Sequence, residues 1–152
     1  MAIQAAGATL SAATSFAVSG SGSTEGIAYD IVNDRLYVAR GSTVYWYSRS
    51  GTLQGSFSYG TTVSDMVVVG STLYVAGSGR SYASTYDTTS HSSTGSLTLP
   101  RSADWWSIAW DEHNQVLWGA FWNGGSRSTW YAIDITNASY TSHSAFNAGP
   151  WG

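Results

Sequence analysis

The sequence predicts an all-β protein of about three four-stranded antiparallel sheets that follow an extended N-terminal arm. The first reason is composition. Gly, Ser, Thr, Tyr and Trp are abundant and only 10% of the residues are charged, which suits strands and tight turns better than helices. The second reason is the spacing of turns: Gly, Asn-Asp or Ser-Gly interrupts short apolar runs every few residues in "GIAYDIVNDRLYVARGSTVYWYSRSGTLQGSF" (26–57). The third reason is that this pattern returns along the chain.

The repeat is clearest between "GIAYDIVNDRLYVAR" (26–40) and "SIAWDEHNQVLWGAF" (107–121). The matches share one constant offset of 81 positions: Ile27/Ile108, Ala28/Ala109, Tyr29/Trp110, Asp30/Asp111, Asn33/Asn114, Leu36/Leu117 and Tyr37/Trp118. A middle copy is expected about halfway, and "SDMVVVGSTLYVAG" (64–77) supplies it, with its first hairpin shortened to a Gly70-Ser71 turn.

Each copy continues with a third apolar run and then a polar, alternating fourth run. The third runs are 42–48, 82–88 and 128–135, and the fourth runs are 52–59, 95–100 and 139–146. Four short strands in a repeat of about 40 residues are the signature of a β-propeller blade. We therefore expect an arm at 1–22 and a three-blade domain at 23–152, with blades at about 23–60, 61–103 and 104–149.

The strand types suit the positions that a blade gives them. The first runs, "GIAYD", "DMVVV" and "SIAWD", are small and apolar, as expected for strands that crowd around an axis and are covered on both faces. The fourth runs carry Ser and Thr, as expected at a rim. Asp30 and Asp111 end the first runs, where a carboxylate can accept hydrogen bonds from turn amides.

The run "GIAYD…N…LYVA…VYWYS" resembles the blade repeats of the YVTN and NHL type propellers, over roughly residues 20 to 148. The resemblance is to an architecture and brings no catalytic motif or cofactor with it. It therefore implies a fold without implying an activity.

Three blades are fewer than the 4 to 8 that typically close a propeller. Two apolar sheet faces would remain open, so we expect a partner that covers them. Two chains could close a six-bladed ring as a homo-oligomer, or the blades could stay open as a wedge on a larger assembly. The arm segment "TSFAVSG" (14–20) alternates like a strand, and Phe16 and Val18 would let it either complete a neighbour's blade or close its own last blade.

Charge and composition exclude several classes of function. The net charge is −3 and Lys is absent, which argues against nucleic acid binding. Cysteine is also absent, the first 20 residues lack the features of a secretory signal, and no run approaches the ~20 apolar residues of a membrane span. We expect a soluble protein, in which the glycosylation pattern at Asn137-Ala138-Ser139 is incidental.

Six of the eight Trp residues lie between positions 105 and 130. Trp110 and Trp118 align with tyrosines of the first copy, so we expect them to pack within or between blades. Three others match no aromatic residue and are expected at blade-connecting or loop positions, with two polar neighbours: Trp105, Trp106 and Trp122, near Asn123 and Arg127. This group would serve as a contact surface for a protein partner, as plain packing, or as a platform for a glycan.

No motif points to catalysis. Adjacent residues such as Asp111-Glu112-His113 point in different directions and rarely hold one metal ion, and the three histidines (His91, His113 and His143) are expected in solvated loops or at the rim. No nucleophile elbow or phosphate-binding glycine loop is present. We therefore predict no catalytic, cofactor or metal site; a hydrolase that depends on His113 or Asp111 is the least favoured hypothesis.

These observations together predict a non-enzymatic structural or binding protein that assembles through its arm and an open blade face. Low charge, the lack of Lys and Cys, and a surface rich in Ser, Thr, Gly and aromatic residues suit a phage or virion component that decorates a capsid or forms part of a tail or fibre. The alternative is a lectin-type module that binds carbohydrate through its loop Trp residues.

Overall fold

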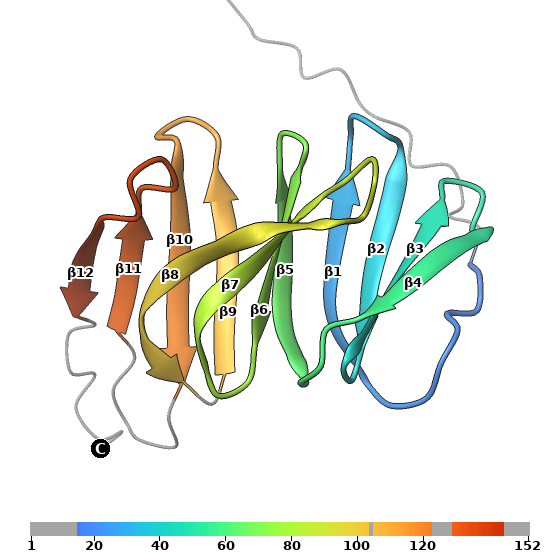
Figure 1. Ribbon diagram of the computed structural model, residues 1–152, viewed down its shortest axis with the longest axis horizontal. Coiled ribbons are helices and arrows are strands. Elements are labelled where there is room, and N and C mark those ends of the chain that lie inside the picture. The colour runs from blue at the N-terminus through green and yellow to red at the C-terminus, as the bar shows by residue number, and fades with distance from the viewer. Residues whose placement is uncertain (1–14, 104, 123–128, 145–152) are drawn as a thin grey trace, which may run out of the picture.

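The computed structural model describes residues 15–103, 105–122 and 129–144 (Figure 1). Within these residues the protein is all-β, with twelve strands in three four-stranded antiparallel sheets that are not closed into a barrel. Sheet 1 contains β1 (Thr24–Asp30), β2 (Arg35–Arg40), β3 (Thr43–Ser48) and β4 (Leu53–Ser58). Sheet 2 contains β5 (Val63–Val69), β6 (Thr72–Gly77), β7 (Arg80–Asp87) and β8 (Ser93–Ala103). Sheet 3 contains β9 (Trp105–Asp111), β10 (Val116–Trp122), β11 (Thr129–Ile133) and β12 (Tyr140–Ser144). The predicted fold class is confirmed.

In each sheet the strands are paired in sequence order, and the pairing register follows the sequence repeat. The same cross-strand pair occurs in each sheet: Ala28 with Tyr37, Val67 with Tyr74, and Ala109 with Trp118. Residues that align in sequence therefore occupy equivalent positions in their sheets, and one sheet can be compared with another residue by residue.

The sheets are neighbours through their first strands, so that β1 lies against β5 and β5 against β9. Gly26 permits the first approach, because a Cβ atom there would lie 3.3 Å from the Cα atom of Asp65. At the second approach the Asp65 carboxylate Oδ2 accepts hydrogen bonds from the Ile108 amide (2.9 Å) and the Ser107 hydroxyl (3.0 Å). Of the first strands, β5 is covered by a sheet on both faces, as expected, whereas β1 and β9 are each covered on one face: Ile27 and Tyr29 are exposed on β1, and Ala109 is exposed on β9.

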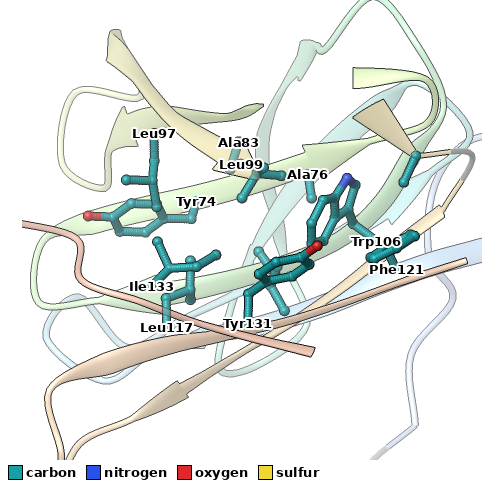
Figure 2. Packing of buried hydrophobic residues seen from close by; sticks show 12 residues of the cluster. Tyr74, Ala76, Ala83, Leu97, Leu99, Trp106, Leu117, Phe121, Tyr131 and Ile133 are labelled. Atoms are coloured by element: carbon teal, nitrogen blue, oxygen red, sulfur yellow. The ribbon is translucent and has the colours of Figure 1, made fainter. Parts of the chain in front are cut away.

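Because side chains alternate along a strand, each sheet has two faces. In sheets 1 and 2 we call the face directed at the next sheet in the chain the leading face and the opposite one the trailing face. The faces of sheet 3 take the names of the equivalent positions in sheets 1 and 2. The leading face of sheet 1 packs on the trailing face of sheet 2 in one core cluster, whose members include Ala28, Tyr37, Ala39, Val44, Met66, Leu73 and Val75. The leading face of sheet 2 packs on the trailing face of sheet 3 in a second cluster, shown in Figure 2, in which Tyr74, Ala76 and Ala83 face Trp106, Leu117, Tyr131 and Ile133. The two contacts are therefore built from equivalent positions, and we call each of them a joint.

Aspartate residues hold four turns in the part of the chain that the structure describes. Asp30 accepts hydrogen bonds from the amides of Val32 (2.9 Å) and Asn33 (3.1 Å), and Asp111 does the same for His113 (3.1 Å) and Asn114 (3.0 Å). The structural role expected for both carboxylates is confirmed. Asp87 accepts from the amides of Thr89 and Ser90, and Asp134 accepts from the Thr136 amide and the Asn137 side chain. In every case the residue four positions after the aspartate has a positive φ: Asp34, His91, Gln115 and Ala138.

The described part of the N-terminal arm, residues 15–22, forms no strand and lies on the trailing face of its own sheet 1. The Phe16 ring packs 5.2 Å from the Tyr47 ring, whose hydroxyl accepts a hydrogen bond from the Ser19 amide (2.7 Å). The Arg40 guanidinium donates to the carbonyl oxygen of Val18 (3.0 Å). This part of the arm does not close the last blade of its own chain, so that alternative is wrong for residues 15–22, whereas completion of a neighbour's blade stays a prediction. Residues 1–14 lie outside the described residues.

Among the residues described, no helix is long and apolar enough to cross a membrane.

Candidate binding face of the third sheet

Among the residues that the structure describes, no sheet packs against the leading face of sheet 3, although this face carries the positions that are buried in sheet 1. Tyr37 in sheet 1 is fully buried, whereas its equivalent Trp118 is 36% exposed. Val44 pairs with Ala39 and Trp130 pairs with the equivalent Ala120, so Val44 and Trp130 hold the same position. Val44 is 0% exposed, whereas Trp130 is 50% exposed. Ala28 is buried and its equivalent Ala109 is exposed. The exposed aromatic surface of sheet 3 therefore carries the positions that are buried in a joint in sheet 1.

A hollow of about 240 Å³ lies on this face. It is lined by Ser107, Ile108, Ala109, Trp118, Gly119, Ala120 and Trp130. Apart from the two indole N–H groups, the polar side-chain group of this lining is the Ser107 hydroxyl, which already donates to Asp65. Such a lining favours burial against an apolar surface over recognition of a polar ligand.

A negatively charged edge borders the aromatic surface. Hydrogen bonds from the Asn114 side chain (2.8 Å) and amide (3.0 Å), with another from the Trp118 indole (3.3 Å), lower the pKa of Asp111 to about 2. Asp111 is thus a carboxylate at neutral pH. In sheet 1 the equivalent Asp30 is fully buried, beside Thr88 of sheet 2.

The trailing face of sheet 1 shows the complementary difference. Ile27 is 61% exposed, whereas Met66 and Ile108, which hold the same position in sheets 2 and 3, are 2% and 5% exposed. Tyr29, on the same side of β1, is 49% exposed. The arm therefore covers Tyr47 of this face but leaves the first strand open.

The joint between sheets 1 and 2 shows what polar contacts accompany the apolar packing. At its edge the Asn33 side chain donates to the Thr88 hydroxyl (3.1 Å), and the Arg35 guanidinium donates to the Thr88 carbonyl (2.8 Å). A loop after β1 in one sheet thus binds the loop between the third and fourth strands of the next sheet.

His91 belongs to this same joint, and the expectation of a solvated loop histidine is wrong for it. Its ring is stacked on Trp46 at 3.8 Å, and its Nε2 lies 3.3 Å from Arg35 and 3.2 Å from the Tyr37 hydroxyl. Because arginine can only donate, Nε2 must be unprotonated. Burial, with the nearby Arg35 charge, lowers the pKa of His91. His143 is exposed, and its ring lies 5.6 Å from Trp118 of sheet 3.

The predicted contact residues are placed as follows. Trp106 does not lie in a loop: it is in β9, is fully buried, and packs against Phe121 (5.6 Å) and Tyr131 (6.3 Å). It is a core residue. Trp105 and Trp122 pair across β9 and β10, but their side chains, like Asn123 and Arg127, lie outside the described residues.

Sequence reasoning also missed the aromatic residues that are exposed. Trp118 was expected to pack because it aligns with Tyr37, and Trp130 was not singled out. The alignment identified the position correctly but could not show whether a following sheet covers it.

In the described ranges, no group of three or more His, Cys, Asp or Glu side chains could hold a metal ion. Asp111 and Glu112 are engaged locally, since the Glu112 carboxylate accepts from the Trp110 indole (2.6 Å).

No protein-family model matches the chain, and no curated protein matches it in sequence. Among solved structures, the chain is similar to one of Kuenenia stuttgartiensis hydrazine synthase, with a TM-score of 0.66 and 19% sequence identity. The similarity covers 80% of this chain and 37% of that chain, so this chain spans well under half of its neighbour's length. At this identity the similarity shows the fold alone.

Proposed function

We propose that this chain is a non-enzymatic binding protein whose function is assembly, and that the leading face of sheet 3 receives a further four-stranded sheet. One observation carries the proposal: Trp118 and Trp130 are exposed at the positions where Tyr37 and Val44 are fully buried by a neighbouring sheet. A face of this kind is normally covered, because an exposed contiguous apolar surface favours association.

The size of the effect can be estimated from the two tryptophans. An aromatic side chain buries up to about 250 Å², so covering the exposed 36% and 50% of Trp118 and Trp130 removes about 200 Å² from water. At about 25 cal/mol per Å² this is worth about 5 kcal/mol. Association costs at least about 4 kcal/mol in lost motion, so the two residues alone would bind weakly. A stable contact needs the rest of the face as well, as in the joints within the chain.

A protein partner fits this face better than a glycan does. Flat indole rings suit a sugar, but a sugar also needs several hydrogen-bonding groups, and the lining supplies few: the Ser107 hydroxyl, whose proton is already donated to Asp65, and the two indole N–H groups. Carbohydrate binding remains the alternative function, and it predicts glycan-array binding that disappears when Trp118 or Trp130 is replaced.

The setting that we propose is a phage or virion particle, in which the chain is a structural component. The support is compositional: no Lys, no Cys and only 10% charged residues. A coat or tail protein encoded beside this chain would support this setting, and a neighbourhood of metabolic enzymes would contradict it.

Trp130→Ser tests the assembly function against Tyr140→Ser as its control. Tyr140 is 52% exposed on the opposite side of sheet 3, where its ring meets Tyr131. We expect Trp130→Ser to lower the sedimenting mass while the far-UV spectrum stays unchanged, and Tyr140→Ser to keep the wild-type mass. An unchanged mass for Trp130→Ser at every concentration would contradict the proposal.

A further inference from the structure

We infer that the leading face of sheet 3 binds the trailing face of sheet 1 in a second copy of this chain, and that two copies close a six-bladed ring through two such joints. This inference rests on the proposed assembly function and names its partner. A six-bladed ring lies within the 4 to 8 blades at which propellers close.

The first argument is that the chain already contains both halves of the joint. Between its own sheets it packs a leading face on a trailing face, and the two faces left exposed are one of each kind. Ile27 is 61% exposed where Met66 and Ile108 are buried, and Trp118 is 36% exposed where Tyr37 is buried. A second copy placed head to tail would bury each of these residues as its equivalents are buried within the chain.

The second argument is charge complementarity at the edge of the joint. Arg35 and Thr72 are the equivalent first residues of β2 and β6. Ser48 pairs with Arg35 and Asp87 pairs with Thr72, so Arg49, which follows Ser48, is equivalent to Thr88, which follows Asp87. Thr88 contacts Asn33 in the loop after β1 and Arg35 at the start of β2. In a joint between copies, the exposed Arg49 of one copy would therefore face the equivalent region of the other, where Asp111 borders the leading face beside Trp118. A cation would meet a carboxylate.

The third argument is the position of the arm. In the joint between sheets 1 and 2, Phe57 of the fourth strand stacks on Tyr86 at 4.3 Å. Tyr47 of sheet 1 is equivalent to Tyr86 of sheet 2, and the Phe16 ring of the arm packs 5.2 Å from the Tyr47 ring. The arm thus takes the place of a preceding fourth strand on the outer part of sheet 1. The inner part, with Ile27 and Tyr29, stays free for the first three strands of sheet 3, which carry Ala109, Trp118 and Trp130.

The test is a pair of charge-reversed chains, Arg49→Glu and Asp111→Lys, studied by sedimentation equilibrium alone and mixed. The wild-type chain is expected at twice its mass of 16.1 kDa. Each variant alone places like charges at both joints, which should weaken the dimer by about a hundredfold. Mixed in equal amounts, the two variants place opposite charges at both joints, and the dimer mass should return.

Asp111→Lys also removes a turn acceptor, so Asp111→Asn provides a second variant that keeps a side-chain oxygen for the turn. It should weaken the dimer less than the reversal does, and Arg49→Glu should cost less affinity in the Asp111→Asn background than in the wild type. A wild-type chain that stays at 16.1 kDa at about 100 µM overturns the inference, as does a mixture that dimerises no better than its components. If Trp130→Ser lowers the mass of the assembly and Arg49→Glu leaves it intact, the proposed assembly function stands. The inference that the leading face of sheet 3 binds the trailing face of sheet 1 is then overturned.

Discussion

In the joint between sheets 2 and 3 one carboxylate, that of Asp65, adds hydrogen bonds to the apolar packing, and replacing it tests how much they contribute. Asp65 accepts hydrogen bonds from the Ile108 amide (2.9 Å) and the Ser107 hydroxyl (3.0 Å), both on the neighbouring sheet. Ile108 is 5% exposed, so in Asp65→Ala its amide would lose its acceptor in a site that water reaches poorly. A buried donor left unpaired costs about 1 to 3 kcal/mol, and a hydrogen bond to a charged group is at the upper end of that range.

The expected loss for Asp65→Ala is therefore about 3 kcal/mol, shared by the Ile108 amide and the amide of Met66, which also donates to Asp65 (2.8 Å) and belongs to a buried residue. Ser107 is exposed and can turn to water, so Ser107→Ala should cost less than about 1 kcal/mol. Asp65→Asn keeps an acceptor oxygen but loses the charge, and it should fall between the two. In a domain of this size, about 3 kcal/mol corresponds to a fall in melting temperature of about 6 to 12 °C.

Urea unfolding of the three variants at one protein concentration, followed by circular dichroism, measures these differences. The order expected for the free energy of unfolding is Ser107→Ala above Asp65→Asn above Asp65→Ala. If Asp65→Ala cost no more than Ser107→Ala, the amide contact would carry no weight and the reasoning would be refuted.

Three further changes test other parts of the structure. Asp30→Ala should lower the free energy of unfolding by about 3 kcal/mol, because Asp30 is fully buried and its part-buried hydrogen bonds to the turn amides and to the Asn33 side chain are lost; Asp111→Ala should lower it by clearly less because the equivalent hydrogen bonds are exposed, and equal losses in urea unfolding would contradict the difference in burial. His91 has a pKa lowered from its ordinary 6.5, so the unfolded state binds the proton more readily; stability is complete above about pH 6.5 and falls as the pH drops through the lowered pKa. The melting temperature between pH 7 and 5 should therefore fall more steeply in the wild type than in His91→Gln, and parallel curves would argue against a neutral, stacked His91. Trp106→Ala empties a fully buried site between Phe121 and Tyr131 and should cost about 3 to 5 kcal/mol, whereas a loss under 1 kcal/mol would indicate that Trp106 is a surface residue.

The sequence repeat was sufficient to predict the three sheets, because alternation and turn residues are local signals that survive in every copy. The matched positions Tyr37 and Trp118 even hold the same register with their partners Ala28 and Ala109. The Asp30 and Asp111 turns were predictable for the same reason, since an aspartate binds amides two and three residues away without help from distant parts of the chain.

The contacts between sheets could not be predicted from the sequence repeat. Trp106 has no aromatic equivalent in the other copies, so its place in the core depends on a space that sheet 2 leaves open. His91 follows a turn aspartate like any loop residue, yet its surroundings come from Trp46 and Arg35 in the preceding sheet. Whether the arm would lie on sheet 1 depended on Tyr47, which alternation within the arm does not reveal.

Hydroxyl-radical footprinting across a range of protein concentrations tests the central claim most directly, because it reports which side chains become covered as copies associate. Because the joint between copies would cover them, Trp118, Trp130, Ile27 and Tyr29 should lose reactivity together as the protein concentration rises, whereas Tyr140 should stay reactive throughout. Protection of Tyr140 in place of these four, or reactivity of all five that never changes with concentration, would contradict it.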